Sequence, residues 1–257
     1  MICIYKKQGE TPLQALKRLR EKQTELKDET LSYAGRLDPM AEGVLLVLVG
    51  DENNNREKFL HQDKAYITEA LFGFETDSYD ILGKLVETGT TSENITQEKL
   101  EKVLERSVGT YEQPYPGFSS QPVNGKPLFE WAREGKLGEL EIPSKRVTVY
   151  KSQLLEVHEI SAQDLLNTIK ERISKVQGDF RQEEIIKLWH QKLDSLQKSA
   201  QKYRTAKIRI ACSSGTYVRS LVHELGKELG SAAIIYSLIR TKVGEKGLSD
   251  CIELEIK

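Results

Sequence analysis

Apolar and polar residues alternate along this chain with two repeat lengths, and these predict both strands and helices. Residues 66–72 and 203–212 alternate at every second position, as the residues of a half-buried strand do. Residues 2–5 and 44–49 are short apolar runs, which are typical of buried strands. In four other segments the apolar positions recur every three or four residues and predict helices: 11–20, 92–106, 128–133 and 217–229. Strands and helices mixed in this way indicate an α+β fold.

The first predicted helix carries a start signal. Thr11 is a favourable N-cap, Pro12 suits the first helical position, and Gln14 stands where a capping box needs Glu or Gln. We therefore expect a capped, amphipathic helix that begins at Pro12.

A pair of helices is predicted in the least regular part of the chain, residues 160–202. Residues 164–177 and 181–202 each place apolar side chains on one helical stripe, and a Gly-Asp step interrupts the pattern. We expect an antiparallel helical hairpin here, preceded by a strand pair or one bent strand over 145–159. Its many charged residues favour a solvated outer face.

The composition is that of an ordinary globular protein. Of 257 residues, 38% are hydrophobic and 30% are charged, and no apolar run is long enough to span a membrane. The N-terminus lacks the apolar core of a secretory signal. The three cysteines are far apart, which is typical of reduced thiols, and the four histidines have no metal-ligand spacing. We therefore expect a cytoplasmic protein with no bound metal ion.

The net charge of −1 bears on whether a nucleic acid could be the partner. Phosphate binding needs clustered lysine and arginine side chains, and it does not need a positive total. The composition alone therefore argues mildly against RNA, unless the basic residues gather on one face.

The segment 32–50 contains the strongest candidate for chemistry. Asp38 stands directly before Pro39, which fixes its own φ and biases Asp38 toward an extended backbone. The apolar run 44–49 follows, so the carboxylate is predicted to lie at the mouth of a buried strand. A carboxylate held there is a candidate catalytic group. The alternative is a turn cap, and spacing alone favours it, since Asp before Pro is common in turns.

The residues around Asp38, G-R-L-D-P-M-A-E-G-V-L, resemble the catalytic motif of TruB-type pseudouridine synthases, the tRNA uridine-55 isomerases. Asp38 matches the essential aspartate of that motif. Similar segments follow in the family's order over most of the chain, at 64–86, 115–135 and 210–244. Their clearest marks are T-D-S-Y-D, which begins at residue 76, and C-S-S-G-T-Y-V-R, which ends at residue 219.

The resemblance implies a fold and a set of functional residues. The fold is a mixed, mostly antiparallel sheet with flanking helices, crossed by the active cleft. It forms one catalytic domain over 1–257, with the hairpin at about 160–202 as an insertion where the family has a short turn. No C-terminal PUA domain is expected, because the chain has no room for that RNA-binding module. The implied catalytic residues are Asp38, Tyr66 and Arg219. The implied substrate-binding residues are Tyr33, Arg36, Leu37, Lys64, Thr76, Asp77, Phe118 and Tyr217.

The resemblance also implies the reaction. A uridine leaves the RNA stack, its N-glycosidic bond breaks, and the base rejoins the ribose through C5. Asp38 acts on the ribose as an ionised carboxylate, and Arg219 holds it charged through a fork that suits both carboxylate oxygens. Tyr66 packs against the base and is also a candidate base for the C5 proton. No redox step is needed, so no cofactor is expected. The expected partner is the T arm of tRNA, bound by a monomer.

Departures from the family's pattern leave alternatives open. Tyr33 replaces a histidine, Pro122 replaces a lysine, and Arg36 replaces a threonine, as in the sister RsuA and RluA types. The target could therefore be a uridine in ribosomal RNA or elsewhere in tRNA. A non-catalytic chaperone that folds tRNA is a second hypothesis, although the retained Asp38 and Arg219 argue against it. A protein-interaction module built on the hairpin is a third, and the hairpin's basic residues could instead reach RNA.

Overall fold

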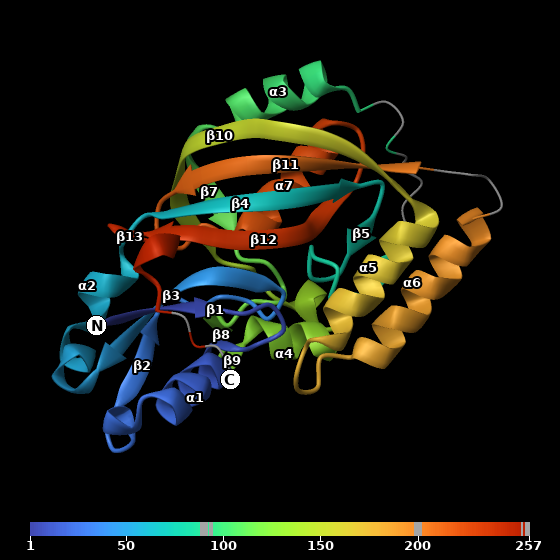
Figure 1. The fold of residues 1–257 in the computed structure, drawn as a ribbon. Coiled ribbons are helices and arrows are strands. Elements are labelled where there is room, and N and C mark those ends of the chain that lie inside the picture. Colours follow the sequence, from blue (N-terminus) through green and yellow to red (C-terminus); the bar gives the residue numbers. More distant parts are fainter. Residues whose placement is uncertain (88–91, 93–94, 198–201, 253, 255–257) are drawn as a thin grey trace.

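The computed structural model describes residues 1–257 except 88–91, 93–94, 198–201, 253 and 255–257. Nine described strands form one sheet in the order β1-β3-β12-β4-β11-β10-β7, with β2 beside β3 and β13 beside β12 (Figure 1). Among these pairings, β3 with β12 is parallel and the others are antiparallel. The strands are β1 (Ile2–Lys6), β2 (Leu31–Ala34), β3 (Ala41–Val49), β4 (Lys64–Phe72), β7 (Gly109–Pro114), β10 (Ser144–Ser161), β11 (Lys202–Cys212), β12 (Ala233–Val243) and β13 (Lys246–Gly247).

Short ladders and helices complete the described structure. β5 (Glu75–Thr76) pairs with β6 (Leu85–Val86), and β8 (Pro122–Val123) pairs with β9 (Lys126–Pro127). The helices are α1 (Pro12–Lys22), α2 (Arg56–Leu60), α3 (Gln97–Arg106), α4 (Leu128–Arg133), α5 (Ala162–Ser174), α6 (Gln182–Gln197) and α7 (Val218–Glu228).

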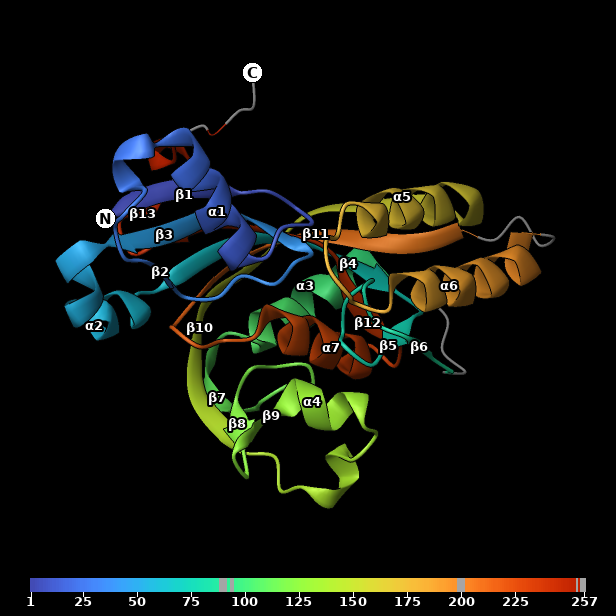
Figure 2. The same ribbon diagram turned by 90° about the horizontal axis from the view of Figure 1, so that it is seen from below.

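Helices cover both faces of the sheet (Figure 2). α3 and α7 pack on one face, where Val222 of α7 shares a hydrophobic cluster with Ile208 of β11. α5 and α6 pack on the other face, where Ile169 of α5 shares a cluster with Leu71 of β4. This arrangement confirms the predicted α+β fold with a mixed, mostly antiparallel sheet.

Local sequence signals account for where several elements begin. The Thr11 hydroxyl accepts the N–H of Gln14 at 3.3 Å, and the Gln14 side chain accepts the N–H of Thr11 at 2.6 Å. The predicted capping box is therefore confirmed, with Pro12 as the first residue of α1. In β4 the alternation is also present, because Tyr66 and Ala70 belong to the cluster under α7.

The start of α3 differs from the prediction. The helix begins at Gln97, and not at residue 92, because Thr96 caps it: the Thr96 hydroxyl accepts the N–H of Lys99 at 3.3 Å. Residues 93–94, which the predicted helix included, lie outside the described residues.

The predicted hairpin is confirmed, with corrected boundaries. Residues 145–159 belong to one long strand, β10, which two register shifts against β11 bend. α5 and α6 follow and lie side by side (Figures 1 and 2). α6 ends at Gln197, residues 198–201 lie outside the described residues, and Lys202 already belongs to β11.

The inner face of the hairpin is part of the core. Trp189 of α6 is fully buried, and its indole N–H donates to the carbonyl of Ile81 at 3.3 Å. Its ring lies 5.0 Å from that of Phe74, measured between centroids. Exposed charged residues such as Glu183 and Lys187 occupy the outer face, as predicted. The hairpin is therefore joined to the sheet by a hydrophobic interface.

Gly43 makes the parallel pairing possible. Its φ is +108°, and a Cβ added there would overlap the carbonyl oxygen of Arg240 on β12. β3 can therefore approach β12 this closely only with glycine at this position.

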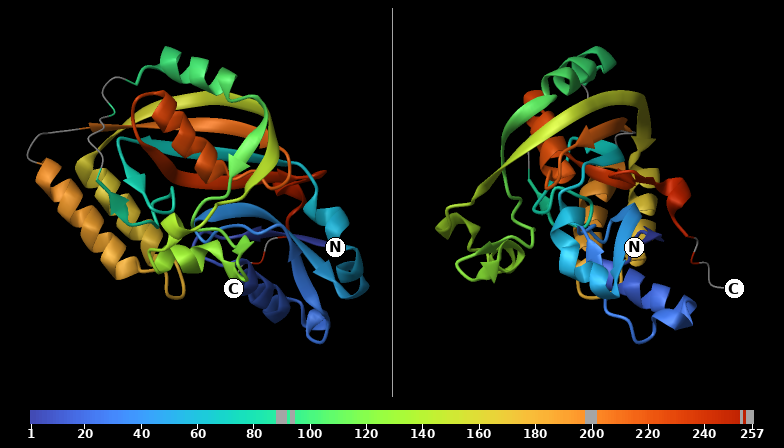
Figure 3. Two further views of the ribbon diagram at one scale, coloured as in Figure 1. Left: turned by 180° about the vertical axis from the view of Figure 1, so that it is seen from behind. Right: turned by 90° about the vertical axis from the view of Figure 1, so that its left-hand side faces the viewer.

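The chain between β7 and β10, residues 115–143, extends away from the sheet, and we call it the arm (Figure 3, right). It contains β8, β9 and α4. Near its start the arm meets α7, where the rings of Tyr115 and Tyr217 make an edge contact at 5.6 Å between centroids. The arm thereby forms one wall of the cavity described next.

Candidate active site

A cavity of about 760 Å³ opens between the loop before β3, the start of α7 and the arm. Eight of the predicted site residues line it: Arg36, Leu37, Asp38, Lys64, Tyr66, Phe118, Tyr217 and Arg219. These residues come from four separate parts of the sequence, and the fold brings them together around one space.

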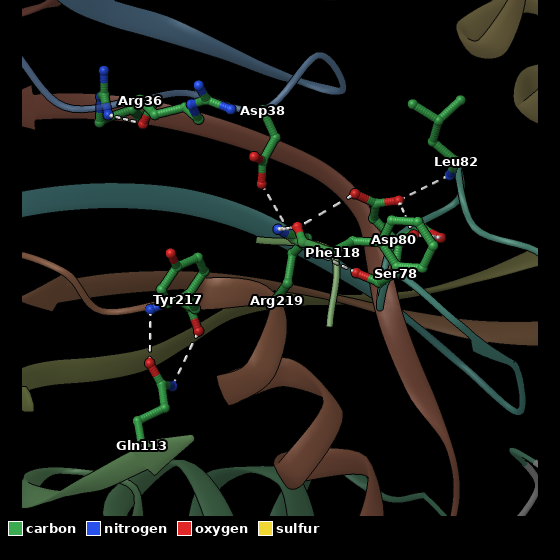
Figure 4. Close-up of polar contacts among 10 residues, drawn as sticks. Arg36, Asp38, Ser78, Asp80, Leu82, Gln113, Phe118, Tyr217 and Arg219 are labelled. Atoms are coloured by element: carbon green, nitrogen blue, oxygen red, sulfur yellow. Dashed lines mark hydrogen bonds and ion pairs between the residues drawn. The ribbon is translucent and has the colours of Figure 1, made fainter. Parts of the chain in front are cut away.

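Asp38 and Arg219 form an ion pair in this cavity (Figure 4). Nε of Arg219 donates to Oδ2 of Asp38 at 2.8 Å. The Arg219 side chain is 5% exposed and the Asp38 side chain 32% exposed. The arginine is thus a buried support, whereas the carboxylate remains open to a molecule in the cavity.

The guanidinium of Arg219 does not bond both carboxylate oxygens, which corrects the expected geometry. Its other nitrogens are occupied by backbone carbonyls, with Nη1 donating to Ser78 at 2.6 Å and Nη2 to Phe118 at 3.1 Å. Arg219 therefore fastens three segments at one point: the Asp38 loop, the Ser78 loop and the arm.

Asp80 is a second carboxylate in the site, and it was not predicted. Its Oδ2 lies 3.9 Å from Nε of Arg219, and its Oδ1 accepts from the Ser78 hydroxyl at 2.7 Å and the Leu82 N–H at 3.0 Å. Burial raises the pKa of Asp80 to about 6, although the charge of Arg219 opposes the shift. The last letter of T-D-S-Y-D was the available signal for this residue.

The electrostatics of Arg219 follow from the same neighbours. Burial lowers its pKa, but the carboxylates of Asp38 and Asp80 outweigh burial and raise the pKa above the ordinary value. Arg219 lies in the first turn of α7, where a positive charge is unfavourable to the helix dipole. The two carboxylates offset that cost, so the pair of acids explains why an arginine is tolerated there.

The start of α7 is fixed from outside the helix. The side chain of its N-cap residue, Tyr217, makes no capping hydrogen bond. The side chain of Gln113 on β7 binds the backbone of Tyr217 instead. The Gln113 side chain accepts the N–H of Tyr217 at 2.8 Å and donates to its carbonyl at 3.1 Å (Figure 4). This contact orients the first turn, and with it Arg219.

Two buried basic side chains hold the loop that carries Asp38, and neither was predicted. Arg240 donates from its three nitrogens to the carbonyls of Val44 at 2.8 Å, Arg36 at 3.1 Å and Gly35 at 3.2 Å. Nζ of Lys6 donates to the carbonyl of Ala41 at 2.6 Å, and burial lowers the pKa of Lys6 to about 7. The loop is therefore fastened on both sides of Asp38.

Tyr66 and Lys64 lie on β4 and line the same cavity as Asp38. Burial raises the pKa of Tyr66 to about 12, so the phenol is neutral near pH 7. Burial lowers the pKa of Lys64 to about 8, and its ammonium donates to the carbonyl of Leu60 at 3.2 Å. A neutral phenol favours a packing role for Tyr66 over a role as base.

The charge of the cavity differs from that of the whole chain. Among the described residues that line it, seven are arginine or lysine and two are aspartate, whereas the chain carries a net charge of −1. The basic members are Arg36, Lys64, Arg133, Lys145, Arg181, Arg219 and Arg240. Basic residues therefore outnumber acidic ones around this cavity, so the net charge of the whole chain is no argument against RNA binding here.

Three predicted substrate-binding residues are not among the residues that line the cavity. Tyr33 lies on β2 and packs against the cluster under α1. Thr76 is buried, and its hydroxyl donates to the carbonyl of Asp80 at 2.7 Å, which closes the turn that positions Ser78. Asp77 forms an ion pair with Arg181, which lies between α5 and α6. Thr76 and Asp77 thus hold residues that line the cavity, without lining it themselves.

Among the described residues, no group of three or more His, Cys, Asp or Glu side chains is arranged to hold a metal ion. No described helix is both long and apolar enough to cross a membrane.

Solved structures share the fold. A chain of the Cbf5-Nop10-Gar1 complex matches with a TM-score of 0.56 and 18% identity, over 95% of this chain and 48% of that one. A chain of an H/ACA RNP bound to a substrate RNA containing 2′-deoxyuridine matches with a TM-score of 0.54 and 17% identity, over 95% of this chain and 47% of that one. This chain spans about half the length of those chains. The likeness shows a shared fold.

Sequence relatives give the family. The model of the TruB family pseudouridylate synthase (N terminal domain) matches residues 23–175. tRNA pseudouridine synthase B of Bacillus cereus is 31% identical over 255 residues, which are 99% of this chain and 69% of that protein. tRNA pseudouridine synthase B of Parabacteroides distasonis is 33% identical over 225 residues, which are 88% of this chain and 76% of that protein. This chain belongs to the TruB family of pseudouridylate synthases, which are isomerases.

Proposed function

We propose that this protein converts a uridine of tRNA into pseudouridine, with uridine 55 of the T loop as the target. The observation that carries the proposal is the ion pair of Asp38 and Arg219, 2.8 Å apart in a basic cavity. The similarity to tRNA pseudouridine synthase B proteins supports tRNA as the substrate. We further propose that the protein acts in the cytoplasm as a monomer.

RNA binding rests on the basic cavity lining. Lysine and arginine side chains neutralise phosphates and supply most of the affinity of such contacts. The target uridine must leave the RNA stack to reach Asp38, and unstacking costs a few kcal/mol. Tyr66, buried and neutral, packs against the extruded base, while Phe118 and Tyr217 supply aromatic surface at the entrance.

The reaction leaves the atomic composition of the uridine unchanged. The bond from N1 to C1′ breaks, the base turns, and a bond from C5 to C1′ forms. C5 loses its proton, and N1 gains one. The Asp38 carboxylate is suited to attack C1′ or to remove a proton from the adjacent carbon of the ribose, and Arg219 holds it in position.

The test is to map pseudouridine in RNA transcripts after incubation with the protein. One tRNA transcript carries the T-loop uridine, a second has cytidine there, and a ribosomal RNA transcript serves as the competing substrate. The proposal expects pseudouridine at the T-loop position with the wild type, and none with Asp38→Ala or with the cytidine transcript. Pseudouridine elsewhere would disprove the target, and its absence from all transcripts would disprove the activity.

A further inference from the structure

The turn of the hairpin forms part of the cavity wall. We call residues 175–181 the hairpin turn, and two of them, Phe180 and Arg181, line the cavity with Asp38 and Tyr66. The match to the family model ends at residue 175, so most of this turn lies beyond it. A segment outside the family match thus contributes to the site.

Arg181 makes two specific contacts there. Its Nη1 donates to Oδ2 of Asp77 at 2.7 Å and its Nη2 to Oδ1 at 3.2 Å, which is a two-point ion pair. Its guanidinium also lies over the ring of Phe118, 4.5 Å from the centroid. One side chain of the hairpin therefore joins the Asp77 loop to the arm.

Those two partners adjoin the groups that hold Arg219. The carbonyl of Phe118 accepts Nη2 of Arg219, and the carbonyl of Ser78, the residue after Asp77, accepts Nη1. Arg181 thus braces both backbone segments against which Arg219 rests. Any movement of these segments changes where the guanidinium places the Asp38 carboxylate.

Other contacts anchor the hairpin turn itself. The Asp179 carbonyl accepts from Nη2 of Arg133 on the arm at 3.1 Å. The N–H of Gln177 donates to the carbonyl of Gly9 at 3.2 Å, and the N–H of Gly9 donates to the carbonyl of Pro39 at 2.9 Å. The turn therefore touches the arm on one side and the support of the Asp38 loop on the other.

The backbone of Arg181 is unusual. Its φ is +65°, in the left-handed region that residues other than glycine rarely adopt. Glycine would adopt this conformation more easily than arginine. The backbone therefore does not require arginine at this position, and its side-chain contacts are what distinguish it from glycine. This property allows a substitution that removes the side chain without straining the backbone.

We propose that Arg181 is a positioning residue for the reaction, which holds the Ser78 loop and the arm so that Arg219 presents Asp38 to the ribose. The kinetic part of this inference rests on the proposed function. Arg181 does not itself react. Its contribution is geometric, because small displacements of reacting groups slow a reaction strongly.

The experiment compares Arg181→Gly with the wild type and with Lys187→Ala. Lys187 is an exposed cation of α6, so its loss controls for a changed charge near RNA. We expect Arg181→Gly to lower kcat about tenfold or more, with KM within about threefold and with the circular dichroism spectrum of the folded wild type. Arg181→Lys, which keeps the charge but cannot make the two-point contact, should also lose rate. Asp77→Asn should resemble Arg181→Gly, and the double variant should be no slower than either single variant.

A second readout needs no RNA turnover. Amide hydrogen exchange of residues 115–121 in the free protein should speed up in Arg181→Gly and stay unchanged in Lys187→Ala. If Arg181→Gly kept the wild-type kcat and the same exchange, the inference would be wrong while the proposed function stood. If the wild type made no pseudouridine, the proposed function would fail, and unchanged exchange in Arg181→Gly would then overturn the bracing role by itself.

Discussion

Asp38 and Arg219 lie 181 positions apart in the chain, yet Nε of the arginine donates to Oδ2 of the aspartate at 2.8 Å. The arginine is buried and bound at all three nitrogens, whereas the carboxylate stays partly exposed. The pair is asymmetric, with one partner that fixes the site and another that faces the substrate. This asymmetry determines what substitutions at the two positions should do.

Arg219→Lys should lower the rate of pseudouridine formation about 100-fold or more while the protein stays folded. A lysine has one nitrogen and cannot bond Asp38 together with the carbonyls of Ser78 and Phe118. Single-turnover kinetics and circular dichroism measure the two effects. Arg106→Lys, at an exposed ion pair with Glu228, is the control and should be unchanged. Wild-type turnover in Arg219→Lys would show that the three hydrogen bonds of the guanidinium are not needed for the reaction.

Asp80→Asn should change how stability depends on pH. Burial raises the pKa of Asp80 to about 6, above the ordinary value of about 3.9. Protonated Asp80 therefore stabilises the folded state below the unfolded pKa, and this contribution is lost as the pH rises through 6. Between about pH 4.5 and about pH 7.5 the loss is about 2 kcal/mol.

Urea unfolding of the wild type and of Asp80→Asn at both pH values tests this. Asparagine does not titrate, so the variant should lose about 2 kcal/mol less than the wild type over this range. Equal changes in the two proteins would show that Asp80 titrates normally.

Gly43→Ala should destabilise the protein by about 2–4 kcal/mol. The new Cβ would overlap the Arg240 carbonyl oxygen, and the φ of +108° is unfavourable for alanine. The control is Gly138→Ala, because a Cβ there meets no atom within 4 Å among the described residues and its φ is not in the left-handed region. Urea midpoints that shift equally in the two variants would contradict the close approach of β3 to β12.

Trp189→Ala should cost about 3–5 kcal/mol, because a fully buried indole leaves a large cavity between the hairpin and the sheet. Trp131→Ala is the matched control, since Trp131 on the arm is only half-buried. We expect the control to cost less than half as much. A Trp189→Ala variant as stable as the wild type would favour the alternative in which the hairpin is a separate interaction module.

The sequence predicted the elements that local patterns encode. Thr11 and Gln14 predict the start of α1, and the two-residue period of β4 predicts its buried face. The resemblance added the pairing of Asp38 with Arg219, which periodicity could not supply. The start of α3 was missed because Thr96, inside the apolar pattern, is the stronger cap.

Supports of the site were harder to predict. Arg240 and Lys6 act on backbone carbonyls that are distant in sequence, so no local spacing reveals them. Asp80 stands in the T-D-S-Y-D motif, but only the packing of the chain brings it to within 3.9 Å of Arg219. Arg181 lies in a turn beyond the residues that the family model matches, and the segments that carried the resemblance do not include it. Such contacts depend on how the segments pack, and the structure was needed to find them.

The central claim is that the Asp38 carboxylate carries the chemistry, and the most direct measurement uses Asp38→Asn, which keeps the shape of the side chain and removes its charge. A tRNA transcript with tritium at C5 of uridine releases that label to water when pseudouridine forms, and filter binding gives the dissociation constant of the same transcript. We predict no tritium release above background from Asp38→Asn in a single turnover, with a dissociation constant within about threefold of the wild-type value. Tritium release by Asp38→Asn at more than a few per cent of the wild-type rate would contradict the account.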